Sequence, residues 1–141
     1  MKRFSMVAVV FCFSLFIAGF VQAACLQSQM AGNWFFHAWS EKIEDPLQTG
    51  EWLYGIMTVT ATGAVGASTV TDSDGLKGQI TGGQLKLSPS CEITGYINIL
   101  EDGVAKKQTF NHGALSRDHN TANIVGRNPK GKLFKIDCIR K

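Results

Sequence analysis

The sequence predicts an all-β fold, an antiparallel up-and-down meander closed into a small barrel of about eight strands. Three observations predict it. Clusters of turn-forming residues recur along residues 24–141 at spacings of about 7–16 residues, which suits short strands joined by short loops. The segments between the clusters are rich in Thr, Val, Ile, Phe and Tyr, and several alternate apolar with polar residues. A β-sandwich is the alternative, because it also hides strand edges.

Eight turn clusters divide this part of the chain into nine segments. The clusters lie at residues 44–46, 61–63, 72–75, 81–83, 88–90, 101–103, 117–120 and 128–131. From Cys91 to Ile99 the odd-numbered positions are apolar or glycine, and the even-numbered ones form the other face. At the chain end, Phe134, Ile136 and Cys138 share one face. Cys91 and Cys138 both fall on faces that should be buried, so we expect a disulfide between them.

The first 23 residues have the pattern of an export signal. Lys2 and Arg3 precede a run without charge that extends to Val21, and Val21-Gln22-Ala23 resembles an A-x-A cleavage site. We expect residues 1–23 to be a cleaved signal peptide and residues 24–141 to form one all-β domain, in the periplasm or secreted. A retained membrane anchor is the alternative, because a span needs about 20 residues and the stretch from Phe4 to Ala24 supplies 21 without charge.

Cys25 suggests a further interpretation of the N-terminal segment. Gln22-Ala23-Ala24-Cys25 resembles a bacterial lipoprotein box at two positions. If Cys12 leaves with the signal, three cysteines remain, and an odd count in an exported protein calls for an explanation. Lipidation of Cys25 would leave Cys91 and Cys138 as a pair and would anchor the protein to a membrane.

Composition excludes several classes of protein. The 141 residues are 45% hydrophobic, 10% aromatic and 18% charged, which is not the composition of a disordered chain. Without Lys2 and Arg3 the chain carries 12 basic and 11 acidic side chains. This near-neutrality argues against nucleic-acid binding, which depends on neutralising phosphates.

Catalytic and metal-binding patterns do not assemble in the sequence. There is no G-x-S-x-G elbow, and His37, His112 and His119 lack the spacing of metal ligands. The acidic residues after the first strand fall in a polar loop, where we expect them to be solvated; they are Glu41, Glu44, Asp45 and Glu51. We therefore expect no enzyme, no metal and no cofactor, but a binding module.

Gly32-Asn33-Trp34 opens the first strand, and Arg140 closes the last one. This arrangement resembles the calycins (lipocalins, avidins and fatty-acid-binding proteins), which often carry a G-x-W on strand one. The resemblance implies a small barrel in which Trp34 packs under Arg140. It also implies a carrier for a small apolar molecule. No Trp follows Trp52, so the resemblance does not extend to a biotin site.

An aromatic cluster within residues 34–54 suggests two modes of binding. On the first strand Trp34 and Phe36 take one face, while the other face is also apolar. If the first face lines the barrel, we expect it to hold a small apolar ligand together with residues from other strands. The expected ligand-binding residues are Trp34, Phe36, Tyr54, Ile93 and Phe110. The other face would then contact an envelope protein or be covered by the loop at residues 41–50; its expected contact residues are Phe35, Trp39 and Trp52.

Charge is spread unevenly along the chain. Residues 41–74 hold six acidic side chains and one basic, whereas residues 117–141 hold seven basic and two acidic. The two regions could complement each other within the fold, or the basic region could face an acidic partner or lipid headgroups. The sequence does not indicate an oligomeric state.

Overall fold

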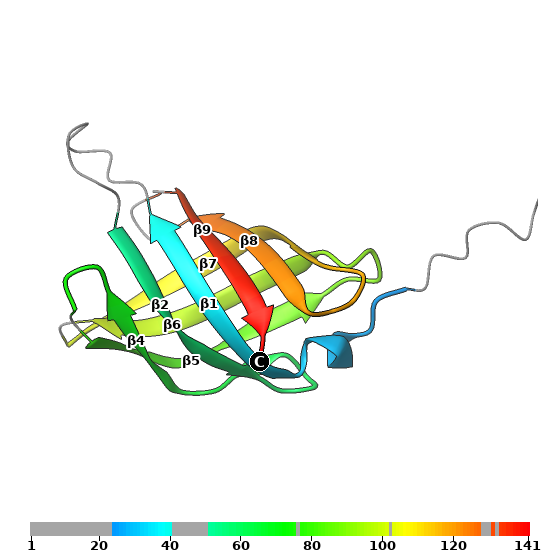
Figure 1. Ribbon diagram of the computed structural model, residues 1–141, viewed down its shortest axis with the longest axis horizontal. Helices are drawn as coiled ribbons and strands as arrows, with labels where there is room; N and C mark the ends of the chain where they lie inside the picture. The colour runs from blue at the N-terminus through cyan, green and yellow to red at the C-terminus, as the bar shows by residue number, and fades with distance from the viewer. Residues whose placement is uncertain (1–23, 41–50, 76, 102, 128–130, 132) are drawn as a thin grey trace, which may run out of the picture.

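The computed structural model describes residues 24–40, 51–75, 77–101, 103–127, 131 and 133–141. The expected signal peptide lies outside the described residues, as does the loop at residues 41–50. Within the described residues the chain forms one 3-10 helix and nine strands (Figure 1). These are η1 Gln27–Met30, β1 Gly32–Ser40, β2 Glu51–Val59, β3 Ala64–Val65, β4 Ser68–Asp72, β5 Lys77–Leu87, β6 Ile93–Glu101, β7 Val104–Leu115, β8 Thr121–Arg127 and β9 Leu133–Arg140.

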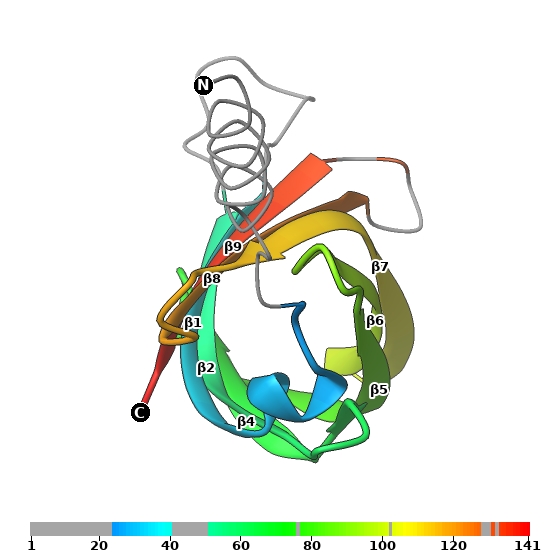
Figure 2. The ribbon, with the colours of Figure 1, turned by 90° about the vertical axis from the view of Figure 1, so that its right-hand side faces the viewer.

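The sheet closes on itself. The strands pair antiparallel in the order β1-β9-β8-β7-β6-β5, and β1 also pairs with β2. Both β3 and β4 pair with β2 and with β5, because the ladder is interrupted at Gly66 and Ala67. The nine described strands therefore fill eight positions around a barrel, seen from one end in Figure 2. The predicted all-β barrel is confirmed, and the sandwich alternative is wrong because the sheet is continuous.

Alternation along the strands separates the interior of the barrel from its surface. On β1 the side chains of Trp34, Phe36 and Ala38 are buried, and those between them are exposed. β8 and β9 alternate in the same way. The expected inward face of the last strand, formed by Phe134, Ile136 and Cys138, is confirmed. Period-two alternation places every second residue in one apolar core.

Two glycines leave room for aromatic rings from the neighbouring strand. A Cβ at Gly55 would stand 3.2 Å from the ring of Phe36 and 2.8 Å from a backbone oxygen of Thr69. A Cβ at Gly126 would collide with the ring of Phe134, its partner in the β8–β9 ladder. Each ring therefore occupies the space above a glycine on the next strand, and an alanine at either position would displace it.

One predicted turn is wrong. Residues 81–83 were expected to reverse the chain, but β5 runs through them and pairs with β6 on both sides. The register shifts between Ile80 and Gly82, where Gly82 has a φ of 146°. The glycine pair thus makes a β-bulge, which bends the strand around the barrel without ending it.

Residues 24–31, which we call the plug, cover one end of the barrel (Figure 2). Met30 is buried in the core, and its carbonyl oxygen accepts a 2.9 Å hydrogen bond from the indole Nε1 of Trp34. The guanidinium of Arg140 lies 4.7 Å from the Trp34 ring centroid, and its nitrogens donate to the carbonyl oxygens of Gln29 and Ala31. The contact between Trp34 and Arg140 implied by the calycin resemblance is therefore present.

Gln27 and Cys25 fasten the plug to the hairpin of β5 and β6. The Gln27 side chain accepts a 2.8 Å hydrogen bond from the backbone nitrogen of Leu87 and donates to the carbonyl of Leu85. The backbone nitrogen of Cys25 donates to the carbonyl of Pro89 at 3.0 Å. The plug is thus bonded to strands on several sides of the barrel end.

The disulfide differs from the expected one. Cys91 is bonded to Cys25, with 5.1 Å between the Cα atoms, and Cys138 is a free, buried cysteine. The expected pairing failed because Cys91 lies in a turn before β6, with a φ of 66°, whereas Cys138 points into the barrel from β9. Lipidation of Cys25 would use the same sulfur atom and is therefore incompatible with this disulfide. Among the described residues, no helix is long and apolar enough to cross a membrane.

The contacts of Arg140 lead to a prediction about stability. Replacing Arg140 with Met keeps the stem of the side chain but removes two charge-assisted hydrogen bonds and the cation–π contact. We expect the free energy of unfolding to fall by about 3 kcal/mol. Urea unfolding of R140M measures this, with K141M as the control. Equal unfolding midpoints for wild type and R140M would contradict the assignment.

The disulfide leads to a second prediction. Peptide mass mapping without reduction should show Cys25 linked to Cys91 and Cys138 as a free thiol. Cys25→Ser should lower the free energy of unfolding by about 4 kcal/mol, since the bond closes a long loop in the unfolded chain. Cys138→Ala, the control, should retain the linkage. A Cys91–Cys138 linkage in the wild type would show that the pairing is wrong.

Candidate functional site

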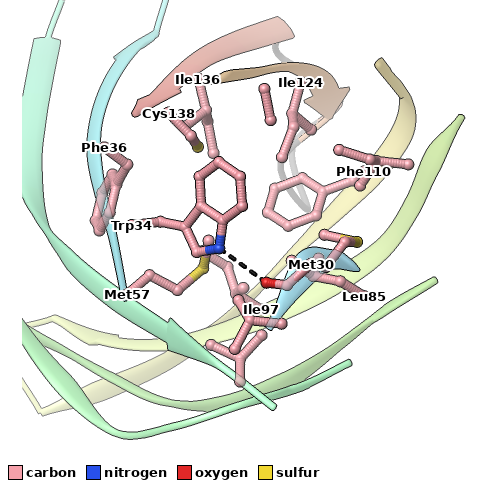
Figure 3. Packing of buried hydrophobic residues seen from close by; sticks show 14 of the residues in the cluster. Met30, Trp34, Phe36, Met57, Leu85, Ile97, Phe110, Ile124, Ile136 and Cys138 are labelled. Carbon is pink, nitrogen blue, oxygen red and sulfur yellow. Dashed lines mark hydrogen bonds between the residues drawn. The ribbon is translucent and has the colours of Figure 1, made fainter. Parts of the chain in front are cut away.

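The interior of the barrel contains four of the five expected ligand-binding residues. Trp34, Phe36, Ile93 and Phe110 are each at most 2% exposed. Tyr54 is instead 39% exposed and lies on the outside of β2. The expected inward position of Tyr54 was wrong because both faces of β2 are apolar in sequence. In the structure Gly55 and Met57 face inward, so Tyr54, next to Gly55, faces outward. Figure 3 shows Trp34 between Phe36, Met57 and the side chains of β8 and β9.

Apolar side chains line the whole inside of the barrel. Near the plug they include Trp34, Leu85, Ile93 and Leu115, and toward the opposite end, which we call the far end, they include Ile99, Phe134 and the partly buried Leu53. The inward residues Ala38, Gly55, Gly78 and Gly126 are small. The rings of Phe36 and Phe134 lie against Gly55 and Gly126, and Val70 lies against Gly78. The interior is therefore apolar from the plug to the far end.

Two polar atoms inside the barrel have no hydrogen-bond partner among the described residues. One is the amide oxygen Oε1 of Gln108, and the other is the hydroxyl Oγ of Ser68. Gln108 lies two residues before buried Phe110 on β7, so it shares the inward face. Ser68 lies two residues before buried Val70 on β4. Both are candidates to bind a polar group inside an otherwise apolar barrel.

The outside of β2, β1 and β9 carries the expected partner-contact residues. Phe35, Trp39 and Trp52 are 43%, 47% and 38% exposed. With three neighbours they form what we call the outer aromatic face, which consists of Phe35, Trp39, Trp52, Tyr54, Ile56 and Ile139. Trp39 is the cross-strand partner of Trp52, and Phe35 lies between Ile56 and Ile139. The loop once expected to cover this face lies outside the described residues.

Ring contacts and charges organise this face. The rings of Trp52 and Tyr54 are stacked with centroids 5.7 Å apart, and His37 lies 6.1 Å from Trp52. On the β9 side, Lys135 Nζ lies 3.1 Å from Asp137 Oδ2. The face therefore has an aromatic side on β2 and a charged side on β9.

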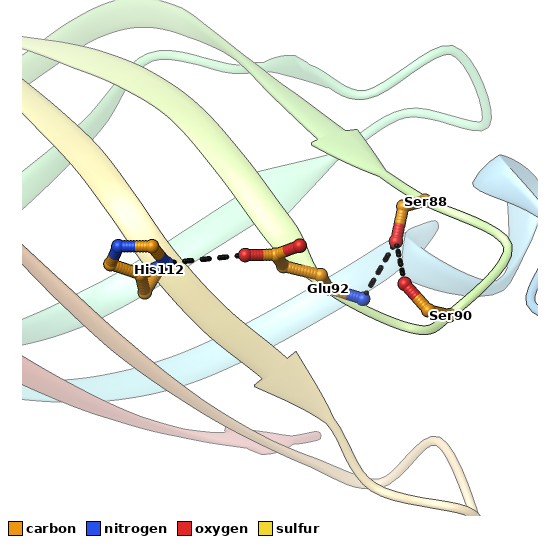
Figure 4. Close-up of polar contacts among 4 residues, drawn as sticks. All are labelled: Ser88, Ser90, Glu92 and His112. Carbon is orange, nitrogen blue, oxygen red and sulfur yellow. Dashed lines mark hydrogen bonds and ion pairs between the residues drawn. The ribbon is translucent and has the colours of Figure 1, made fainter.

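A histidine–carboxylate pair lies elsewhere, on the surface near the plug (Figure 4). His112 Nδ1 is 3.2 Å from Glu92 Oε1, and their side chains are 80% and 47% exposed. The neighbouring hydroxyls of Ser88 and Ser90 lie 2.8 Å apart, and Ser88 Oγ accepts from the backbone nitrogen of Glu92. These contacts make Ser88 and Ser90 part of the turn that leads into β6. They do not place a hydroxyl on the imidazole.

Metal ligands do not gather in the described part of the chain, where no group of three or more His, Cys, Asp or Glu could hold an ion. His112 pairs with Val125 in the β7–β8 ladder, and His119 lies in the following turn. His37 is on the outer aromatic face, so the three histidines are separate.

The fold and these sites define a small closed antiparallel β-barrel with an apolar interior. No known protein family matches the sequence, and neither does any curated protein. Among solved structures, a de novo designed fluorescence-activating β-barrel is similar, with a TM-score of 0.57 at 15% sequence identity. The similarity covers 83% of this chain and 99% of the designed chain. At this identity it shows the fold alone.

Cys138 allows a prediction about pH. Burial, followed by the carboxylate of Asp137, raises the pKa of its thiol from 9.0 to about 12. The folded protein therefore keeps a proton that the unfolded chain releases, so this contribution to stability is complete below pH 9.0 and declines as pH rises toward 12. Between pH 8.5 and 10.5, wild type should lose about 1–2 kcal/mol more stability than Cys138→Ala. Parallel pH dependences of urea unfolding would contradict this.

Proposed function

We propose that this chain is an exported binding module that holds a small, mostly apolar molecule inside its barrel. The observation that carries the proposal is the buried amide oxygen of Gln108, which has no hydrogen-bond partner among the described residues. An unpaired buried acceptor costs about 1–3 kcal/mol, so it usually has a functional reason or a bound partner.

The lining of the barrel supports the chemical class of the ligand. The walls near Gln108 are apolar, since Ile97 is its cross-strand partner and Phe110 is its inward neighbour on β7. A ligand with an apolar body and one hydroxyl or N–H donor would fit these walls and bond to Gln108, while the hydroxyl of Ser68 offers a second polar contact.

Two features support export. A disulfide between Cys25 and Cys91 is typical of an oxidising compartment. The sequence before Cys25 has the order of a signal peptide, with a charged start, an apolar run and a small-residue site. We propose binding rather than catalysis, because the acid–base pair of Glu92 and His112 lies on exposed surface, and no nucleophile of the described residues is hydrogen-bonded to the imidazole.

The outer aromatic face supports a second candidate function, contact with a protein in the cell envelope. Its six large apolar side chains are 38–57% exposed on three adjacent strands. Contiguous apolar patches of this kind usually mark interaction sites. This candidate is independent of a ligand inside the barrel, because inward and outward side chains alternate along the same strands.

Gln108→Leu tests the interior site. The change removes the unpaired acceptor, so the ligand-free protein should gain about 1 kcal/mol of stability while ligand occupancy falls. Native mass spectrometry of the non-reduced protein from its own host measures occupancy, and anilinonaphthalene sulfonate fluorescence measures access for an apolar probe. Thr109→Leu, on the adjacent outward position, is the matched control.

A second variant narrows the interior. Ala38→Phe adds a ring at an inward position near the far end and should displace both the ligand and the probe. A bare polypeptide mass for the wild type, together with no fluorescence response, would overturn the interior site and leave the surface candidate.

A further inference from the structure

The outer aromatic face leaves a large apolar area in water. Aromatic side chains present about 150–250 Å² each, so four rings at the observed exposures leave roughly 350 Å². Ile56 and Ile139 bring the patch to roughly 500 Å², the upper part of the range for monomeric proteins. With the polar residues His37, Lys135 and Asp137 around it, the face approaches the roughly 800 Å² that each partner contributes to a stable interface.

The closed ladder restricts how a partner can dock. The β1–β9 and β1–β2 ladders use the backbone groups of the strands that carry the face. A partner therefore cannot add a strand there and must bind through side chains. The pattern of those side chains then decides which partner fits.

That pattern complements itself. Cross-strand neighbours form three rows, each with one residue from β2, one from β1 and one from β9. The rows are Trp52-Trp39-Lys135, Tyr54-His37-Asp137 and Ile56-Phe35-Ile139. In each row the β2 residue is chemically suited to the β9 residue. An aromatic ring matches a cation, a phenol O–H matches a carboxylate, and isoleucine matches isoleucine.

We propose that the outer aromatic face binds a second copy of this chain in a symmetric dimer. The two-fold axis runs along β1 in the plane of contact. A rotation of 180° about this axis leaves each row at the same position along β1 and exchanges its β2 end with its β9 end. β2 of one copy therefore lies over β9 of the other. Trp52 then faces Lys135 of the second copy, Tyr54 faces Asp137, and Ile56 faces Ile139. Each contact occurs twice, as in the two-fold interfaces that are commonest among homo-oligomers.

Phe35, His37 and Trp39, from the central strand, meet their own copies on the axis. This burial removes the most exposed ring of the face, Trp39, from water. The inference rests on the second candidate function above and names its partner. It does not depend on a ligand inside the barrel.

Sedimentation of the oxidised full chain as produced by its host, from 1 to 100 µM, tests the dimer directly. We expect a concentration-dependent dimer, and Trp39→Ser should raise its dissociation constant about thirtyfold, as for an interface hot spot. Val104→Ser is the matched control, because Val104 is 57% exposed on β7, away from the face. A wild-type monomer throughout this range would overturn the proposal and favour a different envelope protein as partner.

A pair of charge variants tests the position of the axis. Ile56→Lys alone and Ile139→Glu alone should each be monomeric, because each places an unpaired charge against isoleucine twice. An equal mixture should recover the dimer, since one contact then pairs Lys with Glu and the other keeps Ile with Ile. Two monomeric variants that stay monomeric when mixed would overturn the proposed axis. Native mass spectrometry of the same variants separates this result from failure of the interior site, whose residues are unchanged, because a ligand bound inside the barrel should remain in each.

Discussion

The antiparallel pairing of β1 with β9 is the constraint on which the rest of the structure depends. It joins the first strand to the last, so the sheet has no free edge and every strand acquires an inside and an outside. It also brings Arg140 over Trp34 and against the plug, which lies 109 residues away from it in sequence at Ala31. Core packing under the plug, closure of one barrel end and continuity of the outer aromatic face all require this single ladder.

Much of the fold could be predicted from local pattern. Alternation identified the inward faces of β6 and β9, and turn residues identified most strand ends. Local pattern could not identify the inward face of a strand whose two faces are both apolar. Tyr54 was misplaced because β2 is apolar on both faces, and the phase is set by ring-on-glycine packing between Phe36 and Gly55. The disulfide could not be predicted because it depends on how Cys25 and the turn at Cys91, 66 residues apart in sequence, come together in the fold. Periodicity along the chain carries no information about such a contact.

Neighbouring residues of one strand belong to two different surfaces, the inside of the barrel and its outside. On β1, Trp34 and Phe36 belong to the interior, whereas Phe35 and Trp39 belong to the exterior. The two surfaces share a backbone but not side chains, so interior packing and exterior contacts can be altered separately. The unpaired atoms of Gln108 and Ser68 lie inside, while the exposed rings lie outside. The candidate sites thus differ in the chemistry that they offer as well as in position.

The disulfide between Cys25 and Cys91 also bears on the order of assembly. In the proposed export, with the N-terminus leading, both of these cysteines would reach an oxidising compartment before residue 138. The plug can then be tied to the β5–β6 hairpin while the last strands are still arriving, and the barrel closes around an end that is already fixed. Cys138 would emerge after Cys25 and Cys91 have paired with each other, and burial then keeps its thiol protonated, the form that does not exchange. The order of the cysteines along the chain, rather than their distances in the finished fold, would in this way favour the pairing of Cys25 with Cys91 over a pairing with Cys138.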